Sequence, residues 1–259
     1  MLRKRVIPCL LLHHRGLVKT VQFKQPKYIG DPINAVKIFN EKFVDEIIFL
    51  DIDASQERRG PDFDHIADIC SECFIPFCYG GGIRSIKDAE RLFTLGVKKV
   101  SLNTVLFRDK AVLPAMARQF GSQSIVATMD VQKKRFSGYV VMAGGGKIKT
   151  HVKPIEYARE LEQLGAGELL INSIDRDGMM QGYASELLTQ IAAAVSIPVI
   201  ACGGAGHLQH IADLLEQTAI SAAGTGSLCV FQGPHKAVLL NYPTPKELKP
   251  IINRGEKPC

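Results

Sequence analysis

The chain has 259 residues, of which 46% are hydrophobic and 22% are charged. This length suits one large α/β domain, and the apolar runs all fall short of the roughly 20 residues that a membrane helix needs. The net charge of +6 comes without a nucleic-acid motif or a basic stretch interleaved with aromatics, so we expect an anionic small molecule as ligand, with neither nucleic acid nor membrane as partner.

Short apolar runs rich in β-formers alternate with segments of helical periodicity. We expect strands over residues 5–12, 46–52, 74–79, 98–102, 124–130, 167–173, 197–201 and 219–224. We expect amphipathic helices over residues 31–43, 85–96, 153–165 and 207–217. The alternation predicts a parallel (β/α)8 TIM barrel, with residues 1–259 forming a single domain that ends in a tail from about residue 240 to 259. An open doubly wound sheet is the alternative.

The sequence contains an internal repeat. Residues 48–55 and 75–82 of the first half resemble residues 171–178 and 197–204 of the second half. An aspartate precedes a Gly-Gly pair by 28 residues in both halves. The repeat predicts two half-barrels, and it pairs the first strands so that Leu11 stands opposite Asp130.

Glycines follow several expected strands. Glycine allows a ligand close to the backbone, and loop N–H groups together with a helix N-terminus bind anions. Barrels of this class often hold a phosphate between the loops after strands 7 and 8, and the repeat offers that arrangement twice. We therefore predict a phosphate site in each half. The expected residues are Gly81, Gly82, Asn103 and Thr104 in one half, and Asp177, Gly178, Gly203, Gly204, Thr225, Gly226 and Ser227 in the other.

Acidic residues mark the same ends of the strands. Asp130 follows an apolar strand, and we expect it to act as a general base. Asp51 is a further catalytic candidate at a strand end, and Lys19 in the long segment after the first strand is a candidate for a lid that closes over phosphate. A helix N-cap or a solvated side chain is the structural alternative for such residues.

Histidines and cysteines give no metal signature. His13 and His14 lack the E-x-x-H or H-x-H spacing of a metal site, and the C-x-x-C pair Cys70 and Cys73 has no second pair. We expect no metal and no cofactor. The seven cysteines are odd in number and scattered, which favours a reducing compartment and predicts a cytoplasmic protein.

Collinear blocks over about residues 1–230 resemble one family, the cyclase subunit of imidazole glycerol phosphate synthase in histidine biosynthesis. They include "LRKRVIPCL", "FLDIDAS", "GGGIRSIKDAERLFTLGVKKVSLNT", "FGSQSIVATMD", "DRDGMMQGY" and "SIPVIACGGAG". The resemblance implies a two-phosphate barrel that receives ammonia from a separate glutaminase subunit and uses it to cleave and cyclise a phosphoribulosyl substrate. It also implies an ammonia entrance, a ring of charged residues at the other face of the barrel, which falls here on Arg5, Glu46, Lys99 and Glu168.

The chain departs from that family at one catalytic position. The family uses two aspartates, and while the second falls on Asp130, the first falls on Leu11, which cannot transfer a proton. In this departure the chain resembles paralogues encoded in surface-polysaccharide (lipopolysaccharide) gene clusters. Those paralogues are thought to pass ammonia to a separate enzyme that amidates a nucleotide sugar. We expect that function. A working cyclase of histidine biosynthesis and a non-catalytic phosphate-binding regulatory barrel are the alternatives.

Overall fold

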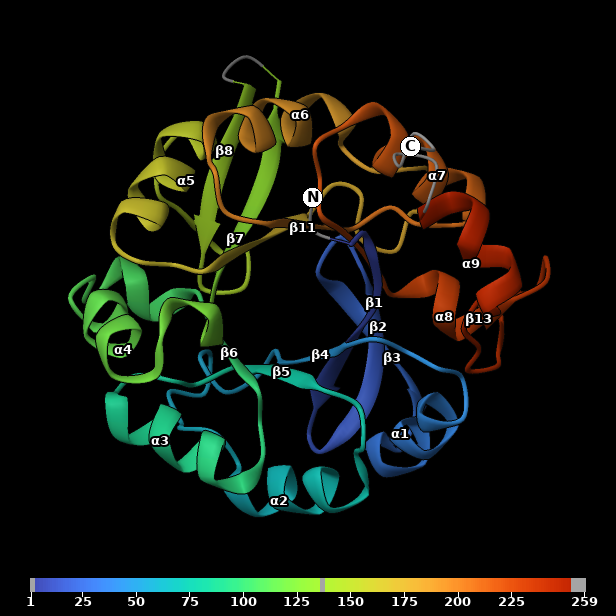
Figure 1. The fold of residues 1–259 in the computed structure, drawn as a ribbon, viewed down its shortest axis with the longest axis horizontal. Helices are drawn as coiled ribbons and strands as arrows, with labels where there is room; N and C mark the ends of the chain where they lie inside the picture. Colours follow the sequence, from blue (N-terminus) through green and yellow to red (C-terminus); the bar gives the residue numbers. More distant parts are fainter. Residues whose placement is uncertain (1–2, 136–137, 253–259) are drawn as a thin grey trace.

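The computed structural model describes residues 3–135 and 138–252. Eight parallel strands form a closed barrel that the pairing of β7 with β10 completes, and helices surround it (Figure 1). The barrel strands are β1 (Arg5–His13), β4 (Ile47–Asp51), β5 (Phe77–Gly80), β6 (Lys99–Leu102), β7 (Ile125–Lys134), β10 (Glu168–Ser173), β11 (Val199–Cys202) and β12 (Ala222–Thr225). The predicted TIM barrel is confirmed, and the open sheet is excluded.

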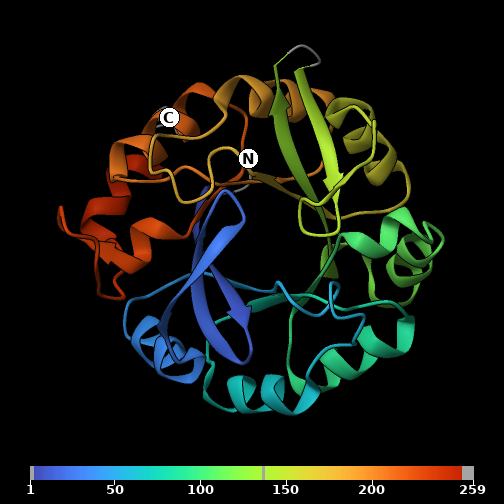
Figure 2. The ribbon, with the colours of Figure 1, turned by 180° about the vertical axis from the view of Figure 1, so that it is seen from behind.

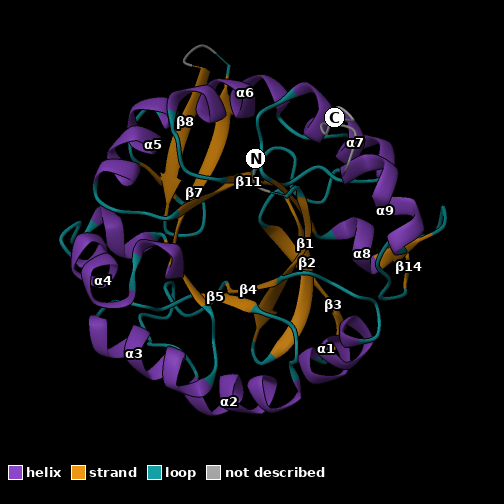
Figure 3. Cartoon of the chain, viewed as in Figure 1, coloured by secondary structure: helices purple, strands orange, loops and turns teal. Residues whose placement is uncertain are grey.

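The helices lie outside the strands, as Figure 3 shows. They are α1 (Pro32–Asn40), α2 (Phe63–Glu72), α3 (Ile86–Leu95), α4 (Val112–Phe120), α5 (Pro154–Gln163), α6 (Ser185–Ala194), α7 (Leu208–Gln217), α8 (Ser227–Val230) and α9 (Pro245–Ile252), with 3-10 turns η1 (Thr104–Phe107) and η2 (Ser122–Ser124). Local sequence fixes their ends. Ser85 and Asp88 form a capping box at the start of α3, and Gly96 ends that helix with a φ of 111°. No helix in the described ranges is both long and apolar enough to cross a membrane.

Strand alternation divides the interior into two apolar regions. Outward side chains of the strands pack against the helices in one large core. Inward side chains form a smaller cluster inside the barrel, made of Ile7, Cys9, Ile48, Cys78, Val126, Leu170, Ile200 and Ala222. Because both faces of each strand are covered, the strands are almost continuously apolar.

Additional strands extend two loops at the carboxyl ends of the barrel strands. β2 (Gly16–Val21) and β3 (Lys24–Gly30) continue antiparallel from β1, while β8 (Gly138–Ala143) and β9 (Ile148–Lys149) continue from β7. The two extensions lie on opposite sides of the barrel (Figures 1 and 2). The segment after the first strand, expected as a long loop, is therefore a β-hairpin.

The expected tail is partly folded. After the short strands β13 (Phe231–Gln232) and β14 (Ala237–Val238), α9 lies against α7. The Tyr242 hydroxyl donates to the carbonyl of Val6 at 2.8 Å, and Leu248 is buried. Residues 253–259 lie outside the described residues.

Candidate functional site

A cavity of about 160 Å³ opens at the carboxyl ends of the strands. Its wall includes most residues expected to bind phosphate: Gly81, Gly82, Asn103, Thr104, Asp177, Gly178, Gly203, Gly204, Gly226 and Ser227. Lys19, Asp51, Asp130 and Leu11 also line it. The fold therefore gathers both halves of the predicted site around one space.

The paired glycines bring backbone to this space in both halves. Gly81 and Gly203 have φ values of 133° and 91°, where a side chain is strained. A Cβ on Gly81 would lie 2.7 Å from the Asp51 carbonyl oxygen, and one on Gly203 would lie 2.7 Å from the Ser173 carbonyl oxygen. The two loops thus have the same construction, as the repeat predicts, and both present backbone where an anion could bind.

Thr225 does not line the cavity, contrary to expectation. It is fully buried, and its Oγ1 lies 3.0 Å from the Cys229 Sγ. The reason is strand alternation, because β12 turns Ala222 and Gly224 inward and Thr225 outward. Gly226 and Ser227 beyond the strand return to the cavity wall, and the buried Ser227 Oγ has no hydrogen-bond partner among the described residues.

Lys19 is fixed rather than solvated. It is buried, and its Nζ lies 2.9 Å from Asp177 Oδ1. The other carboxylate oxygen of Asp177 accepts from Thr20 Oγ1 at 2.6 Å. A Cβ on Gly226 would lie 2.9 Å from the Lys19 Cε, so the absence of a side chain there makes room for the lysine. Lys19 therefore lies directly beside the glycine loop of the second half.

Asp130 combines burial with one hydrogen bond. Its Oδ2 accepts from Asn103 Nδ2 at 2.8 Å. Burial raises the pKa of Asp130 to about 7, with a smaller contribution from the charge of Asp177 and an opposing one from the Asn103 hydrogen bond. A carboxyl with a pKa near neutrality can both accept and donate a proton.

Asp51 is held in a network of its own. Its carboxylate accepts from two guanidinium nitrogens of Arg59, at 2.8 and 3.0 Å, and from the backbone N–H groups of Asp53 and Ala54, both at 3.0 Å. Both oxygens are therefore occupied. This arrangement fits a carboxylate that shapes the loop after β4 better than one that exchanges protons with a ligand.

Four charged side chains form a ring at the other end of the barrel. Arg5, Lys99 and Glu168 begin β1, β6 and β10, and Glu46 directly precedes β4. Lys99 Nζ lies 2.8 Å from a carboxylate oxygen of Glu46 and 2.8 Å from one of Glu168. Arg5 pairs with the same two glutamates, at 2.6 Å for Glu46.

The ring keeps its cations charged. Burial opposes the charge of Lys99, but Glu168 and Glu46 outweigh it and raise the pKa of Lys99. The same balance raises the pKa of Arg5. The apolar cluster inside the barrel lies on the strands between this ring and the cavity, since Arg5, Ile7, Cys9 and Leu11 succeed one another on the inward face of β1.

Comparison with known proteins shows which family the chain belongs to. The family model described as "Histidine biosynthesis protein" matches residues 5–233. The chain is 52% identical over 248 residues to the "Putative imidazole glycerol phosphate synthase subunit hisF2" of Pseudomonas aeruginosa, covering 96% of this chain and 99% of that protein. It belongs to the imidazole glycerol phosphate synthase cyclase-subunit family.

Other members of the family are also similar along most of their length. Identity is 48% over 253 residues with the "Putative imidazole glycerol phosphate synthase subunit hisF3" of Vibrio vulnificus, covering 97% of both chains. It is 42% over 228 residues with the "Imidazole glycerol phosphate synthase subunit HisF" of Alkaliphilus metalliredigens, covering 88% of this chain and 90% of that protein.

Several residues that line the cavity are not predicted by the sequence pattern. Asn172 is buried, and its Oδ1 has no partner among the described residues. Ser101 Oγ lies 2.5 Å from Thr128 Oγ1 deeper in the cavity. Asn172 follows the inward-facing Leu170 by two residues on β10, so its position in the cavity depends on how that strand alternates. Strand alternation could have revealed Thr128, two residues before Asp130.

Proposed function

We propose that this chain receives ammonia from a glutaminase partner and conducts it through the barrel, for amidation of a nucleotide sugar in surface-polysaccharide biosynthesis. The two chains would form a heterodimeric glutamine-dependent amidotransferase pair, in which this chain is the lyase- or cyclase-type subunit. The cavity would bind a phosphorylated small molecule, and a separate sugar-amidating enzyme would use the ammonia. The cell compartment consistent with this role is the cytoplasm.

One relationship carries the proposal: Leu11 lies where the family's first catalytic aspartate falls, while the charged ring at the opposite face is complete. β1 and β7 are four strands apart in the eight-stranded barrel, so Leu11 and Asp130 lie across the cavity from each other. Loss of one general acid or base costs about 10²–10⁴-fold in rate. A chain that keeps the entrance but lacks one proton-transfer group is suited to delivering ammonia rather than to cyclising a substrate.

The ring and the apolar cluster together fit an ammonia path. Neutral ammonia crosses an apolar layer at little cost, whereas ammonium would pay the large penalty of a buried charge. The side chains of Arg5 and Lys99 are 21% and 22% exposed, against 7% or less for the glutamates. The long cationic side chains are therefore the ones expected to swing aside and open the ring.

Exposed aromatic residues beside the ring support a docked partner. Phe43 and Phe74 are 81% and 83% exposed and precede the neighbouring strands β4 and β5. Asn40 joins their loops, since its Oδ1 accepts from the Phe74 N–H at 3.2 Å. Exposed aromatic side chains of this size are typical anchors of protein interfaces, and a glutaminase docked here would deliver ammonia directly at the ring.

A working cyclase of histidine biosynthesis is the second candidate. One observation favours it, because a pKa near 7 would let Asp130 alternate between acid and base and so replace the missing aspartate in part. This candidate predicts substantial turnover of the phosphoribulosyl substrate by the chain as it stands.

Isotope competition tests the proposed channel. The chain is combined with a glutaminase partner and with the amidating enzyme and its nucleotide sugar, then supplied with amide-¹⁵N glutamine in an excess of unlabelled ammonium. We expect ¹⁵N-enriched product from the wild type and from Lys98→Ala, an exposed neighbour of the ring. Lys99→Ala should alter glutamine-dependent product formation and its ¹⁵N enrichment more than ammonia-dependent formation. Equal effects on the two activities, or product labelled only to the bulk ammonia level, would refute the channel.

A further inference from the structure

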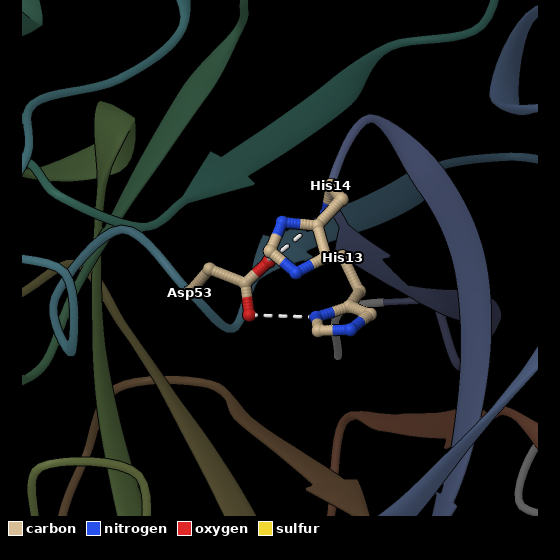
Figure 4. A group of neighbouring side chains, drawn as sticks. All are labelled: His13, His14 and Asp53. Atoms are coloured by element: carbon tan, nitrogen blue, oxygen red, sulfur yellow. Dashed lines mark hydrogen bonds and ion pairs between the residues drawn. The ribbon is translucent and has the colours of Figure 1, made fainter.

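Two histidines and an aspartate meet at the rim of the barrel (Figure 4). His13 ends β1, His14 begins the turn to β2, and Asp53 follows β4. His13 Nδ1 lies 2.7 Å from Asp53 Oδ1, and His14 Nδ1 lies 3.8 Å from Asp53 Oδ2. One ligand atom from each residue falls within 4.8 Å of the other two.

The backbone holds these side chains in register. Leu12 pairs with Asp51 in the β1–β4 ladder, and the N–H of Ile52 donates to the Leu12 carbonyl at 3.1 Å. The backbone N–H of His14 donates to Asp53 Oδ2 at 2.9 Å. The carboxylate is thus aimed at the histidines by the main chain rather than by mobile side chains.

The charge of Asp53 is not matched by a strong cation. Asp53 is buried, yet among the described residues its ion-pair partners are only His13 and His14. Its neighbours differ, because Asp51 pairs with Arg59 and Asp62 pairs with Arg15. A buried carboxylate without a lysine or arginine is costly unless another positive charge approaches it.

The turn that carries His14 has an uncommon conformation. His14 and Arg15 have φ values of 46° and 64°, and they form the two-residue connection between His13 and Gly16. Hairpin turns of this kind favour Asn and Gly at both positions, since a larger side chain is strained there. The turn places the His14 imidazole beside His13, with ring centroids 4.1 Å apart.

We propose that His13, His14 and Asp53 bind one Zn²⁺ ion through the two Nδ1 atoms and a carboxylate oxygen. Ligand atoms of a tetrahedral zinc site lie about 3.3 Å apart, given bonds of about 2.0–2.1 Å, and the distances of the two Nδ1 atoms from the Asp53 carboxylate, 2.7 Å to Oδ1 and 3.8 Å to Oδ2, fall on either side of that value. Nδ1 coordination requires the neutral rings to carry their protons on Nε2. Small rotations of the exposed His14 ring would complete the set.

The proposed ion leaves one position open, which suits a water molecule or an oxygen of an anionic ligand. His13 lies two residues beyond Leu11 on the same face of β1, so the ion would sit at the rim of the cavity. The sequence does not reveal this site, because the two histidines lack the spacing of a known metal motif and the third ligand comes from the loop after β4. The inference is independent of the ammonia proposal.

Zinc titration of the metal-free full-length chain tests the site. Calorimetry at pH 7.5 should show one site in the wild type, and His14→Ala and Asp53→Asn should each weaken it at least tenfold. Two double variants serve as controls and should retain it: His207→Ala with His210→Ala, a second adjacent histidine pair, and Cys70→Ser with Cys73→Ser.

Thermal unfolding with and without Zn²⁺ gives a second readout. The ion should raise the melting temperature of the wild type and of both controls, but not of His14→Ala, whose exposed side chain can be removed without unfolding the chain. Unchanged affinity in both site variants, or loss of binding only in the cysteine control, would overturn the proposal and leave a hydrogen-bonded cluster.

Discussion

Leu11 and Asp130 face each other across the barrel cavity, from β1 and β7. The repeat makes them equivalent positions of the two half-barrels, yet one carries an isobutyl group and the other a carboxyl with a pKa of about 7. The opposed pair of positions therefore keeps a carboxyl group only in the second half, while the backbone loops that can receive an anion are present in both.

Asp130 should make stability depend on pH. Its raised pKa means that the folded chain holds a proton that the unfolded chain has released between about pH 4 and pH 7. Stability is then lost as the pH rises toward 7. Asp130→Asn should remove this loss and be more stable than wild type at pH 8 by up to about 4 kcal/mol, and by only about 1 kcal/mol near pH 4.5.

Urea unfolding at the two pH values measures the effect. The exposed Asp64→Asn serves as the matched control and should show no such pH-dependent gain. If Asp130→Asn and the wild type differ equally at both pH values, burial does not govern the protonation of Asp130.

The buried pair Lys19 and Asp177 should be important for stability. Asp177→Ala leaves the ammonium group of Lys19 buried without its partner, and we expect a loss of about 3–5 kcal/mol in the free energy of unfolding. The exposed pair Lys110 and Glu160 offers a control, because Glu160→Ala should cost less than about 1 kcal/mol. Similar losses in the two variants, measured by urea denaturation, would contradict this account of Lys19.

The sequence predicts the barrel well because each inner strand is an apolar run. It does not predict β2 and β3, since β3 is polar, mostly exposed and contains Pro26, a residue unusual within strands. Glycines and acidic residues at the strand ends predict most of the cavity wall, because the carboxyl ends of all eight parallel strands meet at one face of the barrel. Thr225 is expected at the cavity and is turned away from it, while Asn172 is not expected there and lines it, because the orientation of both depends on where each strand ends and which way it alternates.

Phe43 and Phe74 should anchor the glutaminase partner. Replacing either with alanine removes a large exposed apolar side chain from the expected interface, and we expect the dissociation constant to rise about tenfold or more. Tyr28 is 64% exposed on β3, away from the ring, so Tyr28→Ala is the control and should bind normally. Surface plasmon resonance with the purified glutaminase measures all three, and unchanged binding by both phenylalanine variants would place the partner elsewhere.

The most direct test of the account is the turnover of the phosphoribulosyl substrate by the isolated chain with free ammonia. We expect a rate at least 100-fold below that of a family member with both aspartates, because Leu11 cannot transfer a proton. Leu11→Asp should recover measurable activity. Leu50→Asp, which adds a carboxyl elsewhere on the same cavity wall, should not. A wild-type rate within tenfold of the ordinary cyclase would contradict the proposal and establish the chain as a working cyclase.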